Sequence, residues 1–120
     1  TAASTGGAGT SAANISTTKI VSGRVLAVYV KYNDSPPAGT TDVVVKTVGT
    51  SPAVPSISFL TITNAATDGY FYPRVTPHGI TGAALVALTI LEPPVIHDYV
   101  NIAIAQANDG DSIDVWLLVD

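Results

Sequence analysis

KIVSGRVLAVYVKY, residues 19–32, is the stretch of sequence that decides the fold. It is rich in the β-branched and aromatic residues that favour strands. Alternation counted from Val25 gives two sets of side chains, which are Val25, Ala27 and Tyr29 on one face and Leu26, Val28 and Val30 on the other. Because both sets are apolar, the stretch predicts a central strand that is covered on both faces. Gly23 within it predicts a bulge or a break into two strands.

Further strands are predicted at short intervals toward the C-terminus. Turn residues separate six apolar or alternating segments, which are residues 42–48, 56–63, 70–75, 83–91, 99–106 and 113–119. Pro73 restricts the third segment to a sheet edge or a bend. The loop NDSPPAGTT, residues 33–41, predicts a hairpin over residues 24–48. The turn Asn108-Asp109-Gly110 predicts a second hairpin, in which residues 113–119 pair back on residues 99–106.

The fold class that these segments predict is all-β. About seven or eight strands joined by turns are typical of a single antiparallel β-sandwich or barrel-like domain. We assign residues 19–120 to this domain and residues 1–18 to an extended N-terminal arm. The chain has no cysteine, so disulfide bonds and cysteine metal ligands are excluded.

The arm reads TAASTGGAGTSAANISTT and holds one isoleucine, three glycines and no charged residue. It offers too little apolar surface to offset the entropy lost when a chain becomes ordered. We therefore expect the arm to be mobile in the free protein and ordered only against neighbouring chains. The residues expected to bind a partner there are Thr1, Ala2, Ala3, Ser4, Thr5, Gly6, Gly7, Ala8, Gly9 and Thr10. The arm also lacks the basic and apolar regions of a signal peptide.

The composition indicates a surface that other proteins cover. Charged residues make up 12% of the chain, against about 25% in typical soluble domains, while 47% of residues are hydrophobic. A small monomer normally needs surface charge to stay apart from its copies, so burial in an oligomer or larger assembly is favoured. The alternative is a thermostable or secreted β domain rich in serine and threonine. A net charge of −4 argues against nucleic-acid binding, and no apolar run is long enough to predict a membrane span.

Signals for catalysis and metal binding are weak. His78 and His97 lie in proline-flanked loops, His97 beside Asp98, but no Gly-x-Ser-x-Gly motif accompanies them. We expect no enzymatic activity. The segment NDGDSID, residues 108–114, gathers oxygen ligands of the kind that Ca²⁺ takes, but it lacks the glycine and glutamate positions of an EF-hand loop. We interpret it as a hairpin turn and expect neither a metal ion nor a cofactor.

The segment TDGYFYPR, residues 67–74, is the densest cluster of polar and aromatic residues. Tyrosine and arginine are enriched in interface hot spots, so Tyr70, Tyr72 and Arg74 are candidate partner-binding residues. Aromatic rings near a loop also stack on sugars, which provides a ligand-binding alternative. In a third interpretation the segment is structural, with both tyrosines in the core and Arg74 paired with Asp68.

Three segments of the chain resemble proteins of tailed bacteriophages. They are IVSGRVLAVYVKYND with the following TTDVVVKT, then LTITNAATDGYFYPR, and finally NIAIAQANDGDSIDVWLLV. In this pattern of strands and loops, residues 19–120 are similar to the small β-rich head decoration, or cement, proteins. The resemblance lies in the pattern as a whole, and no residue role is carried over from it.

The resemblance implies a non-enzymatic virion structural protein that binds and reinforces the shell on the capsid exterior. The implied partners are further copies of the chain, as a homotrimer, and the major capsid protein or other virion subunits. Such proteins often clasp capsid subunits with an N-terminal arm. Two alternatives stay open, which are a carbohydrate- or receptor-binding β module of a tail or fibre, and a tail-tube or baseplate component.

Overall fold

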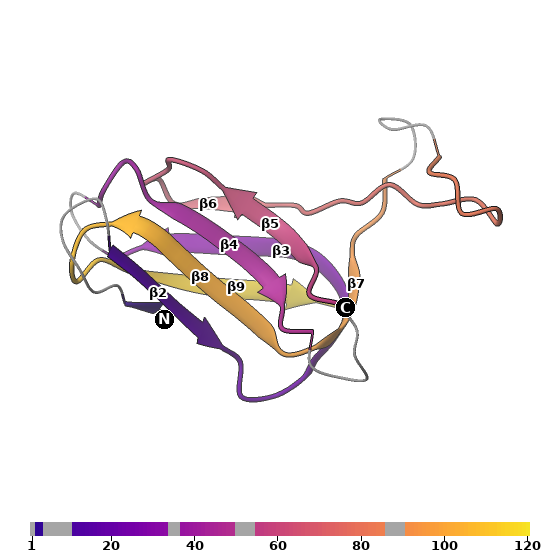
Figure 1. Cartoon of the computed structure of the whole chain (residues 1–120), viewed down its shortest axis with the longest axis horizontal. Coiled ribbons are helices and arrows are strands. Elements are labelled where there is room, and N and C mark those ends of the chain that lie inside the picture. The colour runs from indigo at the N-terminus through magenta and orange to yellow at the C-terminus, as the bar shows by residue number, and fades with distance from the viewer. Residues whose placement is uncertain (1, 4–10, 34–36, 50–54, 86–90) are drawn as a thin grey trace.

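The computed structural model describes residues 2–3, 11–33, 37–49, 55–85 and 91–120. Within these residues two antiparallel sheets pack face to face as a β-sandwich (Figure 1). The predicted all-β fold class is confirmed. The same residues include no helix of the length and hydropathy that crossing a bilayer requires.

The first sheet is built around the long strand β3 (Val21–Tyr32). Strand β9 (Ser112–Val119) pairs with one edge of β3, and β1 (Ala2–Ala3) continues the sheet beyond β9. The other edge of β3 is shared, because β7 (Val95–Asp98) pairs with its first residues and β6 (Gly69–Phe71) with its later ones. The connection from β6 to β7 therefore leaves the sheet partway along this edge.

The second sheet has the strand order β2–β8–β4–β5. Its strands are β2 (Ser11–Ser16), β8 (Val100–Ala107), β4 (Asp42–Thr47) and β5 (Ser58–Ile62), and each is antiparallel to its neighbours. Burial alternates strictly along β4, as expected for a strand with one face on the core. The second sheet therefore covers one face of β3 and leaves the other to the outside.

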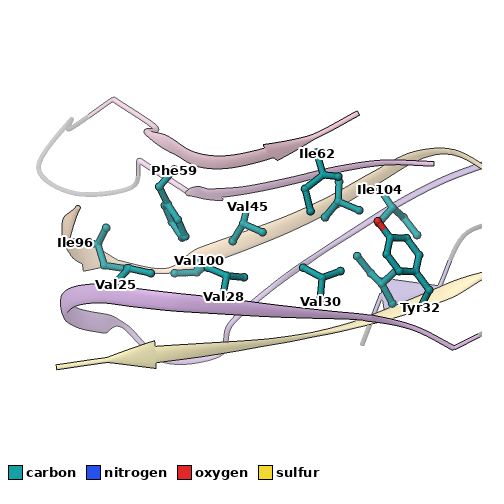
Figure 2. Packing of buried hydrophobic residues seen from close by; sticks show 12 residues of the cluster. Val25, Val28, Val30, Tyr32, Val45, Phe59, Ile62, Ile96, Val100 and Ile104 are labelled. Atoms are coloured by element: carbon teal, nitrogen blue, oxygen red, sulfur yellow. The ribbon is translucent and has the colours of Figure 1, made fainter. Parts of the chain in front are cut away.

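The core lies between the two sheets and is almost entirely aliphatic (Figure 2). Its buried side chains come from both sheets and are Val25, Val28, Val30, Tyr32, Val43, Val45, Phe59, Ile62, Ile96, Val100, Ile104 and Ile113. Branched residues dominate because they pack well on pleated strands and fill the narrow space between two sheets. Fully burying one such side chain contributes roughly 1.5–3 kcal/mol, so this layer is the main source of stability.

A β-bulge in β3 changes the expected alternation of its side chains. The pairing of β3 with β9 shifts register between Val25 and Ala27. Val25 and Val28 consequently both lie in the core, although strict alternation places them on opposite faces. Beyond the bulge, Ala27 and Tyr29 lie on the outer face. Gly23, where we expected the irregularity, lies within a continuous strand.

Both predicted hairpins are wrong, because each of the two loops joins strands of different sheets. β3 belongs to the first sheet and β4 to the second, and the same holds for β9 and β8. The Asp111 carboxylate, in the loop between β8 and β9, links this loop to the one between β3 and β4. Its Oδ2 accepts hydrogen bonds from the N–H groups of Ala38 (3.1 Å) and Asn108 (3.0 Å). Turn residues reverse the direction of the chain, but they do not determine which strand the following segment pairs with.

The division of the chain at residue 18 also needs correction. Strand β2, expected within the arm, pairs with β8, and β1 pairs with β9. Ser11 is fully buried. Small uncharged residues can satisfy their backbone groups at a sheet edge, which composition alone does not reveal. Of the predicted partner-binding residues in the arm, Thr1 and residues 4–10 lie outside the described residues.

Two predicted strands differ from the structure around the projecting β6–β7 connection. The segment 70–75 is cut to β6, because Pro73 has no N–H to donate to a ladder. The segment 83–91 forms no strand in its described part, where Ala84 makes an isolated bridge with His78. Residues 86–90 lie outside the described residues. Strand β7 follows this segment and was not predicted.

At Gly23 the backbone of β3 lies very close to the end of β9. Its φ is +130°, and an added Cβ atom would overlap the carbonyl oxygen of Asp120. We expect Gly23→Ala to lower the free energy of unfolding by about 1–3 kcal/mol. Gly39→Ala, where a Cβ meets nothing within 4 Å, is the matched control and should change it by less than about 0.5 kcal/mol. Urea unfolding followed by circular dichroism measures both, and equal effects would contradict this close approach.

Tyr32 makes the stability of the sandwich depend on pH. Its hydroxyl is buried and has no hydrogen-bond partner among the described residues. Burial raises the pKa of Tyr32, and the negative charge of Asp68, whose Oδ1 accepts a hydrogen bond from the Tyr32 N–H (2.7 Å), raises it further. The unfolded chain therefore loses this proton at a lower pH than the folded chain. Stability that is fully present below the unfolded pKa is lost as pH rises toward the folded pKa.

We expect the free energy of unfolding to fall as pH rises above about 10, the ordinary pKa of tyrosine. Tyr32→Phe has no hydroxyl to ionise or to leave unpaired, so it should reduce this fall and at pH 7 be equal to the wild type or more stable by about 1 kcal/mol. Tyr72→Phe, at an exposed position, is the control and should follow the wild type. Urea titrations at neutral and alkaline pH measure the difference. A Tyr32→Phe chain with unchanged pH dependence would contradict this explanation.

Candidate functional site

The outer face of the first sheet carries a row of aromatic side chains. Trp116 of β9, Tyr29 of β3 and Tyr70 of β6 are direct cross-strand partners. The ring centroids of Tyr29 and Tyr70 lie 4.6 Å apart, and those of Tyr29 and Trp116 lie 5.5 Å apart, distances at which tilted rings attract one another. Leu118, opposite Ala27 in the register, extends the row. We call these five residues the aromatic face.

The aromatic face is exposed and hollowed. Tyr70 is 67% exposed, Leu118 60% and Trp116 51%. With Tyr29, Ala27 and Leu117, these residues line an open hollow of about 380 Å³. The lining side chains are apolar except for two phenol hydroxyls and one indole N–H. A contiguous exposed apolar surface of this kind on a small domain is a candidate for contact with another molecule.

The local sequences of β3 and β9 explain why large apolar residues meet here. Alternation along β9 packs Ile113, Val115 and Leu117 against the core, so Trp116 and Leu118 point outward. Leu117 is only partly buried and also borders the hollow. The bulge in β3 turns Tyr29 outward at the register of Trp116. We predicted that β3 is apolar and covered on both faces, but the second sheet covers only one of them. The other apolar face of β3 is available to a partner.

The structure brings one predicted binding residue into the aromatic face and places another near it. Tyr70 is the β6 member of the row, and Tyr72, two residues further on, is 63% exposed. The interpretation in which both tyrosines enter the core is therefore wrong. Trp116, Tyr29 and Leu118 were not predicted as site residues. Alternation in IDVWLLV, residues 113–119, was the available signal, because it separates Trp116 and Leu118 from the core-facing residues.

Arg74 has a structural role at the bulge. Its Nη1 donates to the carbonyl oxygens of Leu26 (3.2 Å) and Pro73 (2.6 Å). Leu26 is the bulged residue, whose backbone groups are left out of the ladder with β9. The expected pairing with Asp68 is wrong, because that carboxylate accepts from the Tyr32 N–H. Arg74 thus fastens the start of the β6–β7 connection to β3.

The described residues 72–85 and 91–94 of the connection between β6 and β7 extend away from the sandwich (Figure 1). In its described part, two isolated bridges hold the outgoing and returning chain together, Val75 with Glu92 and His78 with Ala84. Connections longer than about 12–15 residues without strands or helices of their own are uncommon and usually functional. We call the described residues 72–85 and 91–94 the projection.

The projection exposes apolar side chains that the sandwich does not cover. Ile80 is fully exposed, Leu91 is 48% exposed and Leu85 38%. Ile80 lies in the turn that is closed by hydrogen bonds from Gly82 N–H to the Gly79 carbonyl (2.9 Å) and from Gly79 N–H to the Ala83 carbonyl (2.8 Å). From residue 75 to residue 91 the sequence has no Lys, Arg, Asp or Glu. Between Arg74 and Glu92 the projection therefore carries no Lys, Arg, Asp or Glu, and it forms a second apolar surface on the same domain.

The outer face of the second sheet differs in chemistry from the aromatic face. It has a polar hollow of about 310 Å³ lined by Asn14, Ser16, Lys46, Val48, Asn101 and Ala103. The Asn101 side-chain amide donates to Ser16 Oγ (3.0 Å) and to the Ile15 carbonyl (3.3 Å). Its polar groups thus fasten β2 to β8, and the apolar surfaces lie on the other side of the sandwich.

The histidine and aspartate candidates have structural partners. His97 Nδ1 lies 2.9 Å from Ser22 Oγ, whereas Asp98 is buried and its two oxygens accept from the N–H groups of Gly49 and Tyr99 (both 2.7 Å). Successive side chains of a strand point to opposite sides, so β7 separates His97 from Asp98. Among the described residues, no group of three or more His, Asp or Glu side chains is placed to hold a metal ion.

Comparison of the chain with protein-family models, curated proteins and solved structures finds no match. The likeness to phage head decoration proteins is therefore a hypothesis from the sequence pattern. The aromatic face and the projection are the surfaces from which a function is argued.

The effect of substituting Trp116 on stability shows whether this side chain serves a docking surface or the core. Trp116→Ala removes an aromatic pair but opens no cavity in the core, so it should lower the free energy of unfolding by less than about 1.5 kcal/mol. Ile104→Ala, at a 2% exposed position, should lower it by about 2–5 kcal/mol. Urea unfolding at high dilution, where association contributes least, measures both. Equal losses would show that Trp116 supports the fold.

Proposed function

We propose that this chain is a non-enzymatic structural protein of a macromolecular assembly, specifically a decoration protein that binds and reinforces the head of a tailed bacteriophage. The observation that carries the proposal is the presence of two exposed apolar surfaces, the aromatic face and the projection, on one small domain. Exposed apolar surface drives association, and few charges on this chain oppose it. Both surfaces fit a subunit that works while covered by other proteins.

The assignment to a phage head is supported by the strand and loop pattern, which resembles that of head decoration proteins. In this function the chain lies on the capsid exterior and contacts the major capsid protein and further copies of itself, as a homotrimer. A protein that binds only the assembled shell stabilises that shell by mass action. A rigid β-sandwich suits this role, because it presents its docking surfaces in fixed positions.

A carbohydrate- or receptor-binding module of a tail or fibre is the second candidate. The observation in its favour is the group of three aromatic rings around an open hollow, since such rings stack on sugars. Small-ligand sites also need several convergent polar groups to fix the ligand. The hollow has only phenol hydroxyls and an indole N–H, which favours a protein partner.

Sedimentation with undecorated heads of the phage that encodes the chain tests the proposal. We expect saturable binding and a higher temperature of head disruption. Tyr70→Ala should weaken binding at least about tenfold, because it removes an exposed aromatic anchor, while Thr63→Asp, an exposed position outside both apolar surfaces, should bind like the wild type. Absence of sedimentation with heads would overturn the proposal. Glycan binding that Tyr70→Ala abolishes would establish the second candidate.

A further inference from the structure

We infer that the projection of one copy docks into the hollow of the aromatic face of a second copy, so that identical chains close into a ring. This inference rests on the self-association in the proposed function and deepens it, because it assigns the two apolar surfaces to each other. Each copy donates one projection and receives another. The contact is heterologous, and repeated contacts of that type form a ring when their rotation closes.

The two surfaces match in charge and in chemistry. The sequence carries no charged residue from residue 75 to residue 91, and none of the side chains that line the hollow is charged. Their contact therefore buries no unpaired charge, which would oppose binding. Ile80 offers a fully exposed branched side chain at a turn, and the hollow offers aromatic rings that an aliphatic group can contact on several sides. Aromatic anchors of this kind dominate interface energetics.

The directions of the two surfaces favour a contact between copies. The projection leaves the first sheet between β6 and β7, where Arg74 fastens it to the Leu26 carbonyl, and extends away from the sandwich (Figure 1). The hollow lies on the outer face of β9, β3 and β6. In the described structure the projection does not cover the hollow of its own chain, since Tyr70, Trp116 and Leu118 stay exposed. The hollow of one copy can therefore be covered by the projection of a second copy.

Each subunit of a ring makes the contact twice, once as donor and once as acceptor. One copy therefore engages both of its apolar surfaces.

Two complementary variants test the inference on the full chain. The projection variant carries Ile80→Asp and Leu85→Asp and keeps an intact hollow. The hollow variant carries Trp116→Ala and Leu118→Asp and keeps an intact projection. All four side chains are exposed, so both variants should fold with the circular dichroism spectrum of the wild type. Thr63→Asp adds one negative charge outside both surfaces, as the hollow variant does within one of them, and is the matched control.

Size-exclusion chromatography with light scattering gives the first readout. The wild type and the control should be closed oligomers at micromolar concentration, and each variant alone should be monomeric. A 1:1 mixture of the variants should form a heterodimer, because one intact projection then meets one intact hollow. Trp116 is the single tryptophan of the chain, and only the projection variant retains it. Its fluorescence emission should therefore shift to shorter wavelength when the two variants are mixed.

The opposite results overturn the inference. A contact between two projections leaves the hollow variant oligomeric, and a contact between two aromatic faces leaves the projection variant oligomeric. A monomeric wild type, or a mixture with neither heterodimer nor spectral shift, excludes the contact altogether. If the hollow variant fails to fold, Tyr70→Asp takes its place, since Tyr70 is 67% exposed. Head binding does not enter these measurements. A chain that stays monomeric but sediments with heads would overturn this inference and the proposed homotrimer, and would leave the proposed binding to the head standing.

Discussion

The register of β3 against β9, with its bulge at Leu26, is the constraint on which the rest of the structure depends. The bulge keeps Val28 in the core and turns Tyr29 outward against Trp116. It also leaves the Leu26 carbonyl to Arg74, which fastens the start of the projection. One extra residue in one strand therefore positions the core, the aromatic face and the origin of the projection together.

The sandwich separates the task of folding from the task of docking. Its stability comes from the aliphatic layer between the sheets, where burial is complete or nearly so. The aromatic face and the projection contribute little to that layer and stay available to other molecules. With charged residues at 12% of the chain, little electrostatic repulsion opposes their coverage. This combination is the physical basis for placing the chain within an assembly.

Prediction succeeded where the signal was local and failed where distant segments had to be matched. Alternation located β4, β5, β8 and β9 to within a few residues, because side chains of a strand alternate with period two whatever its neighbours are. The composition of residues 67–74 identified Tyr70 as a candidate but did not link it to Tyr29 or Trp116. Those three residues meet only because β6 and β9 flank β3. The hairpin at Asn108-Asp109-Gly110 was wrong for a related reason, since a turn does not specify the sheet that receives the next strand.

By itself the sequence determined an all-β chain with few charged residues and a high content of hydrophobic residues. It also determined that β3 is apolar on both faces. Only the tertiary structure decided which of those faces is buried, that β2 belongs to a sheet, and that the projection extends from the sandwich. The physical reason is that composition and alternation depend on residues close in sequence. Which strands become neighbours depends on how two whole sheets pack over one shared core.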